Sequence, residues 1–133
     1  MTIDAKLDAI GLVVADMAAT CAFYRTLGVA VPDGAESAPH VEAVLPGGLR
    51  LMFDTEEVIR SMDPHWTAPT GGGRTSLAFR LPDPAGVDAA YAALTAAGYR
   101  GEMEPFDAPW GQRYAVVLDP DGTGADLFAP AAS

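Results

Sequence analysis

The sequence predicts an α+β fold made of two tandem βαβββ modules, because the same order of segments occurs twice along the chain. Residues 9–16 and residues 76–83 are similar apolar segments that both end at an aspartate. A helical stretch with an aromatic residue follows each of them and ends at a glycine, Gly28 or Gly98. Each half then closes with a turn and an apolar strand. Internal repeats define the architecture of a chain, so we expect two curved sheets, each half-covered by a helix.

The length of 133 residues suits one compact unit. We expect residues 1–133 to form a single domain, with one module in residues 6–61, the other in residues 74–130, and a connector in residues 62–73. Three consecutive glycines lie at positions 71–73. Neither a Lys-Ser/Thr pair nor a helix start follows them, so a flexible hinge is favoured over a phosphate-binding loop.

The first module begins with an apolar strand, which we expect at residues 7–14. Asp16 is suited to cap the helix that follows, because its carboxylate can accept hydrogen bonds from the amides of the first turn. The helix is expected over residues 17–27, and Gly28 can supply the left-handed conformation at its end.

The rest of the first module reads as a loop, a hairpin and a short helix. Residues 30–39 are rich in proline, glycine and serine, which is typical of a loop. Residues 40–45 and 49–53 are expected to pair as strands around a Pro-Gly-Gly turn. A short helix should begin within residues 54–57, where a capping residue precedes two acids.

The second module repeats this order. Asp83 and Pro84 combine a capping side chain with proline at the first helical position, and Gly98 ends the predicted helix. Residues 112–118 and 125–128 are expected to be the last pair of strands.

Composition places the chain among packed, globular proteins, since half of its residues are apolar. No run of 18 apolar residues occurs, so no membrane span is expected. The N-terminus lacks the basic and then apolar pattern of a signal peptide, and the single cysteine, Cys21, cannot form an internal disulfide. These features predict a cytoplasmic protein. The abundance of alanine and the preference for arginine over lysine are typical of a GC-rich bacterial genome.

The formal net charge is −10, from 18 acidic and 8 basic residues. Nucleic-acid binding requires clustered lysine and arginine that neutralise phosphates, and the basic residues here are scattered along the sequence. Nucleic acid is therefore not expected as a partner. An acidic surface either serves solubility or attracts cationic and hydrogen-bonding small molecules.

The order and spacing of these segments resemble the vicinal oxygen chelate superfamily, which includes glyoxalase I, extradiol dioxygenases and bleomycin resistance proteins. The resemblance covers about residues 6–130. The segments that carry it are Val14-Ala15-Asp16, Phe23-Tyr24, Leu27-Gly28, Asp119-Pro120-Asp121-Gly122 and Asp126-Leu127-Phe128. It implies a glyoxalase/bleomycin-resistance-like fold, in which the curved sheets of the two modules enclose a cup.

Within this superfamily the chain most resembles the mitomycin-binding antibiotic resistance proteins. The segments that carry this closer resemblance are Ser37-Ala38-Pro39-His40, Asp63-Pro64, Ala68-Pro69-Thr70-Gly71-Gly72 and Trp110-Gly111-Gln112-Arg113-Tyr114-Ala115. The resemblance implies a small-molecule ligand that is aromatic or quinone-like.

The resemblance also implies where a metal would bind. Relatives that use a metal place a histidine on the first strand of a module and a glutamate or histidine on the last. The matching positions are Ala9, Leu51, Ser76 and Asp126. Transition metals require three or four imidazole, thiolate or carboxylate ligands, and only Asp126 could ligate. We therefore expect no metal and no other cofactor. In place of a role as metal ligand, Asp126 is expected to be a hydrogen-bonded acid at the end of a strand.

Side chains two residues apart on a strand share a face, so these positions also predict the lining of the cup. The first hairpin is expected to put Phe53 opposite His40, and Leu51 opposite Glu42. In the second hairpin, Phe128 is expected near Tyr114 and Asp126 near Val116. A slip of one residue would invert these assignments.

The predicted lining combines a floor of small residues with aromatic walls and a few polar groups, which is typical of small-molecule sites. The predicted ligand-binding residues are His40, Glu42, Phe53, Trp66, Trp110, Tyr114, Asp126 and Phe128. No residue is predicted to be catalytic. Core packing remains an alternative for Phe53 and Phe128, interface packing for Trp66, and an inert exposed position for His40.

Three functions remain open. The first is a metal-free protein that sequesters a planar antibiotic or related natural product and confers self-resistance. The alternative is a glyoxalase- or dioxygenase-like enzyme, a lyase or isomerase that acts on a small metabolite. It would either depend on a metal or use acid–base groups alone, with His40 and Glu42, or Asp126, as the base. The third is a carrier of a biosynthetic intermediate.

A homodimer is expected, because exposed sheet edges are commonly managed by pairing. The resemblance implies that module one of one chain packs against module two of the other. His40 and Phe53 of one chain would then face Tyr114 and Asp126 of its partner.

Overall fold

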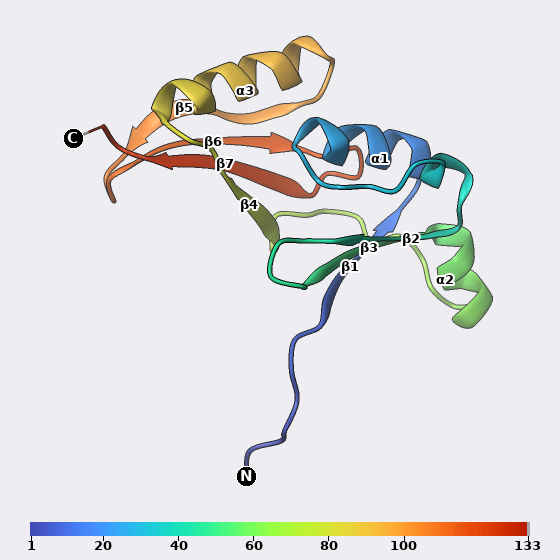
Figure 1. Ribbon diagram of the computed structural model, residues 1–133. Helices are drawn as coiled ribbons and strands as arrows, with labels where there is room; N and C mark the ends of the chain where they lie inside the picture. Colours follow the sequence, from blue (N-terminus) through green and yellow to red (C-terminus); the bar gives the residue numbers. More distant parts are fainter. Residues whose placement is uncertain (133) are drawn as a thin grey trace. The chain divides into compact units, whose positions relative to one another are not determined.

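The computed structural model describes residues 1–132, and its α+β architecture confirms the predicted fold class. The chain divides into two compact units, Met1–Ala68 and Pro69–Ser133. The strands of the described residues form one three-stranded sheet and one four-stranded sheet, one in each unit. In each unit a helix lies along one face of the sheet (Figure 1). None of the helices within residues 1–132 combines the length and apolar character that crossing a bilayer requires.

The first unit contains a mixed sheet with the strand order β1-β3-β2. Its elements are β1 (Ala9–Val14), α1 (Met17–Thr26), a 3-10 helix (Ala35–Ser37), β2 (His40–Val44), β3 (Arg50–Thr55) and α2 (Glu56–Met62). Strand β1 runs parallel to β3, and β2 runs antiparallel to it. The sheet therefore holds three strands where the repeat predicts four. The segment before β2 instead forms the 3-10 helix, and Gly34 in front of it takes a left-handed φ of 76°.

The second unit contains the complete βαβββ order. Its elements are β4 (Ser76–Arg80), α3 (Pro84–Ala96), β5 (Gly101–Ala108), β6 (Gln112–Leu118) and β7 (Gly124–Pro130). The strand order is β4-β7-β6-β5, with β4 parallel to β7 and the other pairs antiparallel. Strands β4 and β5 are therefore the two edges of this sheet.

The helices begin and end where the sequence predicts. The Asp16 carboxylate accepts a hydrogen bond from the Ala19 amide at 3.1 Å, and the Asp83 carboxylate accepts one from the Gly86 amide at 2.7 Å. Gly28 and Gly98, just past the ends of α1 and α3, have φ values of 86° and 99°. This left-handed conformation carries a steric penalty for residues with a Cβ, so glycine ends both helices.

Each sheet packs one face against its helix. In the first unit, Phe53 of β3 is fully buried and stacks on Tyr24 of α1 with ring centroids 5.3 Å apart. In the second unit, Leu127 of β7 is buried on the α3 side of the sheet, as are Val87 and Leu94 of α3 itself. Burial of each such side chain stabilises the fold by about 1.5–3 kcal/mol.

The observed register corrects the prediction for the first hairpin. His40 pairs with Asp54 and Glu42 pairs with Met52, whereas Phe53 was expected opposite His40 and Leu51 opposite Glu42. The turn closes with a hydrogen bond from the Leu45 amide to the Leu49 carbonyl at 2.8 Å. The turn is therefore centred on Gly47, half a residue later than the expected centre between Pro46 and Gly47.

This shift exchanges the faces of the first sheet. Phe53 and Leu51 point into the core, where they are 0% and 2% exposed, and they do not share a face with His40 and Glu42. The second hairpin has the expected register, with Tyr114 opposite Phe128 and Val116 opposite Asp126.

Replacement of Phe53 by alanine tests this register. We expect Phe53→Ala to lower the free energy of unfolding by about 3–5 kcal/mol, because it removes a buried aromatic ring. The neighbouring change Met52→Ala, on the opposite face, should lower it by at most about 1 kcal/mol. Urea denaturation of both variants measures the difference, and equal effects would contradict the assignment of faces.

Candidate functional site

The open face of the second sheet, opposite α3, carries the strongest candidate site. The register arranges its side chains in rows that run across the strands. One row consists of Ala78, Asp126 and Val116, and the next of Arg80, Phe128, Tyr114 and Phe106. The predicted residues Tyr114, Asp126 and Phe128 therefore do lie together on one face.

A polar cluster of Tyr114, Asp126 and Ser76 joins β6, β7 and β4 on this face. The Tyr114 hydroxyl donates a hydrogen bond to Oδ2 of Asp126. The Ser76 hydroxyl donates to the same oxygen at 3.2 Å. Burial, together with the neighbouring Asp126 carboxylate, raises the pKa of Tyr114 to about 12. Tyr114 is therefore a protonated hydroxyl at neutral pH, and Asp126 is held by two uncharged donors.

An aromatic cluster of Phe106, Trp110 and Tyr114 adjoins these polar groups. The Trp110 ring meets Tyr114 edge to face with centroids 5.5 Å apart, and it meets Phe106 in the same way at 6.3 Å. Trp110 remains 60% exposed. Its indole N–H donates to Gln112 Oε1 at 2.8 Å, so the ring is oriented by its neighbours rather than freely mobile.

A hollow of about 660 Å³ occupies the other end of the open face. Its lining includes the connector glycines, the side chains of Ser76, Val116 and Leu118, and the charged residues Arg74, Arg100, Glu102, Asp121 and Asp126. The hollow is more polar than the mostly apolar cup expected from the sequence. Arg74 and Arg100 were missed, because they lie far apart in the sequence and precede the two opposite edge strands of the sheet.

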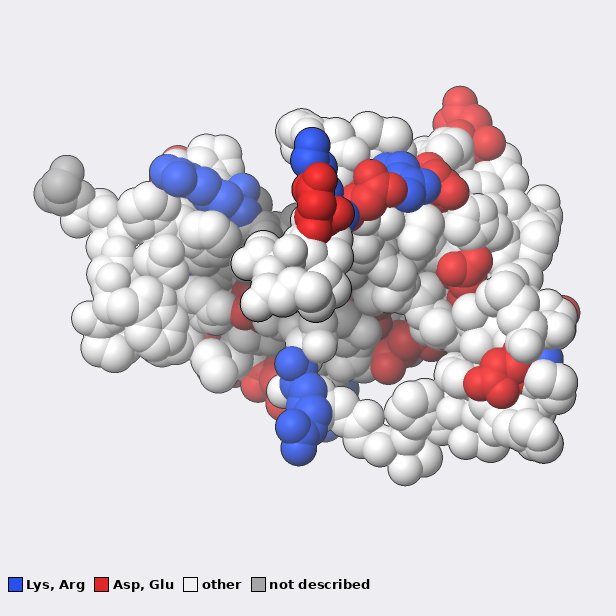
Figure 2. Space-filling model, turned by 90° about the horizontal axis from the view of Figure 1, so that it is seen from below, with Lys and Arg blue, Asp and Glu red and all other residues white. Residues whose placement is uncertain are grey.

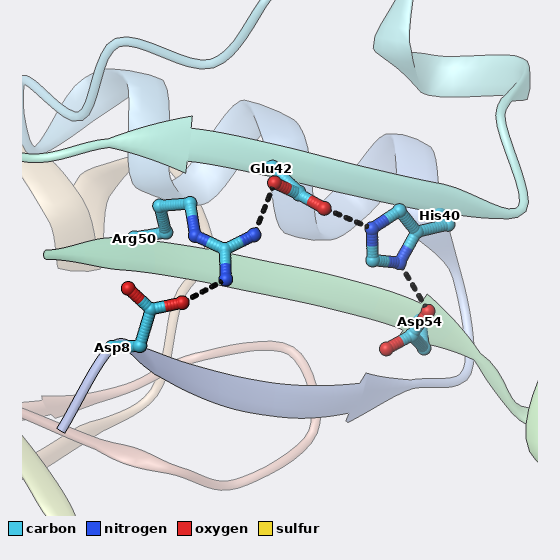
Figure 3. A network of polar contacts seen from close by, with 5 residues as sticks. All are labelled: Asp8, His40, Glu42, Arg50 and Asp54. Carbon is cyan, nitrogen blue, oxygen red and sulfur yellow. Dashed lines mark hydrogen bonds and ion pairs between the residues drawn. The ribbon is translucent and has the colours of Figure 1, made fainter. Parts of the chain in front are cut away.

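The open face of the first sheet carries a chain of alternating charges (Figure 3). Nδ1 of His40 lies 2.5 Å from Asp54, and Nε2 lies 2.7 Å from Glu42. The Arg50 guanidinium then joins Glu42 at 2.6 Å to Asp8 at 2.5 Å. These five side chains come from β2, β3 and the segment before β1.

The two carboxylates determine the charge of His40. Hydrogen bonds to Glu42 and Asp54 raise the pKa of His40, and the bonds from His40 and Arg50 lower the pKa of Glu42. A histidine flanked in this way favours the protonated imidazolium. His40 is thus suited to hold or donate a proton rather than to remove one from a substrate.

The remaining predicted residues lie elsewhere. Phe53 belongs to the core of the first unit, as described above. Trp66 also belongs to the first unit, where the Arg60 guanidinium lies 5.3 Å from its ring centroid. This cation–π contact gives Trp66 a local structural partner.

The charged side chains of the surface also occur in local groups. On the face drawn in Figure 2, basic side chains occur in separate places among several acidic groups.

Comparison with known proteins identifies the class to which this chain belongs. A profile of the Glyoxalase family, described as the glyoxalase/bleomycin resistance protein/dioxygenase superfamily, matches residues 6–126. The chain therefore belongs to this superfamily. No curated protein matches it.

Several solved structures are similar to this chain. A glyoxalase/bleomycin resistance protein/dioxygenase from Nocardioides is 26% identical with a TM-score of 0.73, and the match covers 100% of this chain and 88% of that one. A family enzyme from Burkholderia phytofirmans PsJN is 22% identical with a TM-score of 0.79, over 95% and 99% of the two chains. A glyoxalase-related enzyme from Fulvimarina pelagi is 21% identical with a TM-score of 0.77, over 93% and 87%. The last two similarities concern the fold alone.

The donor set does not fit the transition metal that some members of the superfamily use. Of the four matching positions, Ala9 offers no ligand atom, Leu51 is buried in the core, and Ser76 is a poor ligand. Asp126 is already held by Tyr114 and Ser76. Within residues 1–132, no group of three or more histidine, cysteine, aspartate or glutamate side chains is arranged to hold a metal ion.

The pKa of His40 provides a test of the charge chain. We expect the His40 ring to titrate above its usual pKa of about 6.5, and Glu42→Gln to lower this pKa more than Asp54→Asn does, because Glu42 is the larger cause. NMR titration of the His40 ring protons measures its pKa in the wild type and in each of the two variants.

The linked effect on stability has a defined sign. A raised pKa in the folded state stabilises the fold fully below pH 6.5, and this contribution is lost as the pH rises through the folded value. The side chain is 42% exposed, so solvent screening keeps the effect small. A His40 pKa at or below 6.5 would contradict the charge chain.

Proposed function

We propose that this chain binds a planar aromatic small molecule on the open face of the second sheet. The observation that carries the proposal is the position of Trp110, a large apolar ring that is 60% exposed yet fixed by contacts with Tyr114 and Phe106. Exposed aromatic rings held in a defined orientation are suited to stacking. Each aromatic pair stabilises a complex by about 0.5–1.5 kcal/mol beyond the area that it buries.

The neighbouring groups suit the rest of such a ligand. Phe128 lies opposite Tyr114 in the next strand and extends the apolar surface. Tyr114 and Ser76 hold Asp126 at the edge of the hollow, so a polar substituent of the ligand could meet a fixed acceptor. Apolar walls with a few placed polar groups are typical of small-molecule sites.

We further propose that the ligand is an antibiotic or related natural product, and that its sequestration confers self-resistance. The family description, which includes bleomycin resistance proteins, and the resemblance to mitomycin-binding resistance proteins support this role. The absence of a suitable metal donor set also favours binding over the metal-dependent chemistry of other members.

An enzyme of the glyoxalase or dioxygenase type is the alternative, and one observation favours it. His40 lies between two carboxylates in a geometry that holds a proton, and such a group can serve as a general acid. Recovery of the ligand after incubation separates the two functions, because a binding protein returns it unchanged and an enzyme returns a product.

We also propose that the chain forms a homodimer. Val44, at the end of the edge strand β2, is 63% exposed, and Met103 on the edge strand β5 is 44% exposed. Apolar side chains on exposed edges favour pairing with a second chain. Sedimentation at micromolar concentration would give the mass of a dimer, and the mass of a monomer alone would contradict the proposal.

Replacement of Trp110 tests the stacking role. We expect Trp110→Ala to weaken the binding of mitomycin C and of anthraquinone-2-carboxylate by roughly 2 kcal/mol, as for an aromatic anchor. The melting temperature should change little, because the ring is mostly exposed. Isothermal titration calorimetry and thermal melting measure the two effects.

Trp66→Ala is the matched control, because it removes the other indole and should leave the affinity unchanged. A loss of about 3 kcal/mol or more in the stability of Trp110→Ala would indicate core packing instead. Unchanged affinity in that variant would also contradict the stacking role.

A further inference from the structure

The arginines of this chain fall into two groups. Arg25, Arg50, Arg60 and Arg113 each form an ion pair with an acidic side chain. Arg74, Arg80 and Arg100 form none within residues 1–132, and all three belong to the second unit. An acidic protein offers many possible partners, so three arginines without one are a distinct feature of this unit.

Arg74 and Arg100 both line the hollow on the open face. They approach it from opposite edges of the sheet, since Arg74 precedes β4 and Arg100 precedes β5. A guanidinium presents several N–H donors in a planar fork that matches an oxyanion in shape and charge. Two such groups around one hollow therefore form a candidate site for a negatively charged group.

The backbone on one side of the hollow adds further donors. Gly71 and Gly73 have φ values of 89° and 90°, a conformation that favours glycine. The amides of residues 71–74 donate to no acceptor within the described chain. Successive free amides in such a loop form concave sites that bind anions. The glycine segment therefore contributes to the hollow through its backbone.

The acidic side chains of the hollow limit the charge of the bound group. Asp126 accepts hydrogen bonds from Tyr114 and Ser76, and Glu102 and Asp121 also line the hollow. All three carboxylates would repel a second negative charge on a ligand. A singly charged carboxylate therefore suits the hollow better than a doubly charged phosphate.

The length of β4 gives the separation between the hollow and the row of side chains that contains Tyr114 of the aromatic cluster. Ser76, at the hollow, and Arg80, in the row of Tyr114, are the two ends of β4. Four residues along a strand span about 13 Å. A ligand with three fused rings and a terminal carboxylate has a matching length.

We propose that Arg74 and Arg100 form an oxyanion subsite, which selects planar aromatic ligands that carry one carboxylate. This inference rests on the proposed function for the aromatic part of the ligand. The oxyanion subsite itself can be tested without an aromatic group, so the two proposals can fail separately.

The first experiment compares two probes that differ only in one group, the charged carboxylate of anthraquinone-2-carboxylate and the neutral amide of anthraquinone-2-carboxamide. Wild-type protein should bind the carboxylate roughly tenfold more tightly, because hydrogen bonds to charged groups are stronger than neutral ones. The double variant Arg74→Gln/Arg100→Gln should bind both probes with equal affinity. Lys6→Gln is the matched control, since it removes one positive charge outside the second unit and should preserve the preference.

The second experiment uses anions without any aromatic group. In ¹H–¹⁵N NMR spectra, sodium acetate should shift the amides of Gly71, Gly72 and Gly73 in the wild type and in Lys6→Gln, with sodium chloride as the ionic-strength control. Inorganic phosphate should cause a smaller effect at equal concentration. The double variant should lose the response, and Arg74→Lys should retain part of it, which guards against a variant that fails to fold.

Each outcome supports or overturns the oxyanion subsite. Acetate shifts that disappear in the double variant support it, even if neither anthraquinone binds and the aromatic proposal fails. Equal affinity of the wild type for carboxylate and carboxamide, with no glycine response to acetate, overturns it and leaves the stacking role of Trp110 intact. A stronger response to phosphate than to acetate would overturn the preference for a single charge.

Discussion

The register of each sheet is the constraint on which the rest of the structure depends. Side chains alternate across a strand, so one pairing decides at once which residues pack against the helix and which remain on the open face. In the first sheet, the pairing of His40 with Asp54 sends Phe53 inward against Tyr24 and brings the histidine to a carboxylate. In the second sheet, the pairing of Tyr114 with Phe128 places both rings on the open face.

The two open faces differ in how their charges are satisfied. On the first sheet, the chain from Asp8 to Asp54 pairs each cation with two carboxylates, so its strongest interactions are internal (Figure 3). On the second sheet, Asp126 is held by uncharged hydroxyls, and the arginines around the hollow have no anionic partner within residues 1–132. The second face therefore has the greater remaining capacity to bind a ligand.

The residues at the positions that match metal ligands and the shape of this face are consistent with each other. Small side chains such as Ala78 stand on the sheet beside Asp126, where they leave space above the strands. Large side chains are concentrated in the aromatic cluster, where Trp110, Tyr114 and Phe106 support one another edge to face. A floor of small residues next to a rigid aromatic wall suits a flat ligand better than a compact one.

The sequence by itself determined the features that depend on local interactions. Asp16 and Asp83 cap helices, and Gly28 and Gly98 end them, because each effect involves residues within one turn. The repeat of these signals was sufficient to predict the α+β fold. The face shared by Tyr114, Asp126 and Phe128 followed from the positions that the family resemblance implies, together with the alternation of side chains along a strand.

Only the tertiary structure decided the features that depend on distant residues. The Pro-Gly-Gly turn permits two registers one residue apart, and packing of Phe53 on a helix far away in the sequence selects between them. The strand order β4-β7-β6-β5 places Arg74 and Arg100 at opposite edges of the second sheet, and both line one hollow. These two arginines lie far apart in the sequence and come together at one hollow only through the pairing of the strands. No local sequence pattern encodes that placement.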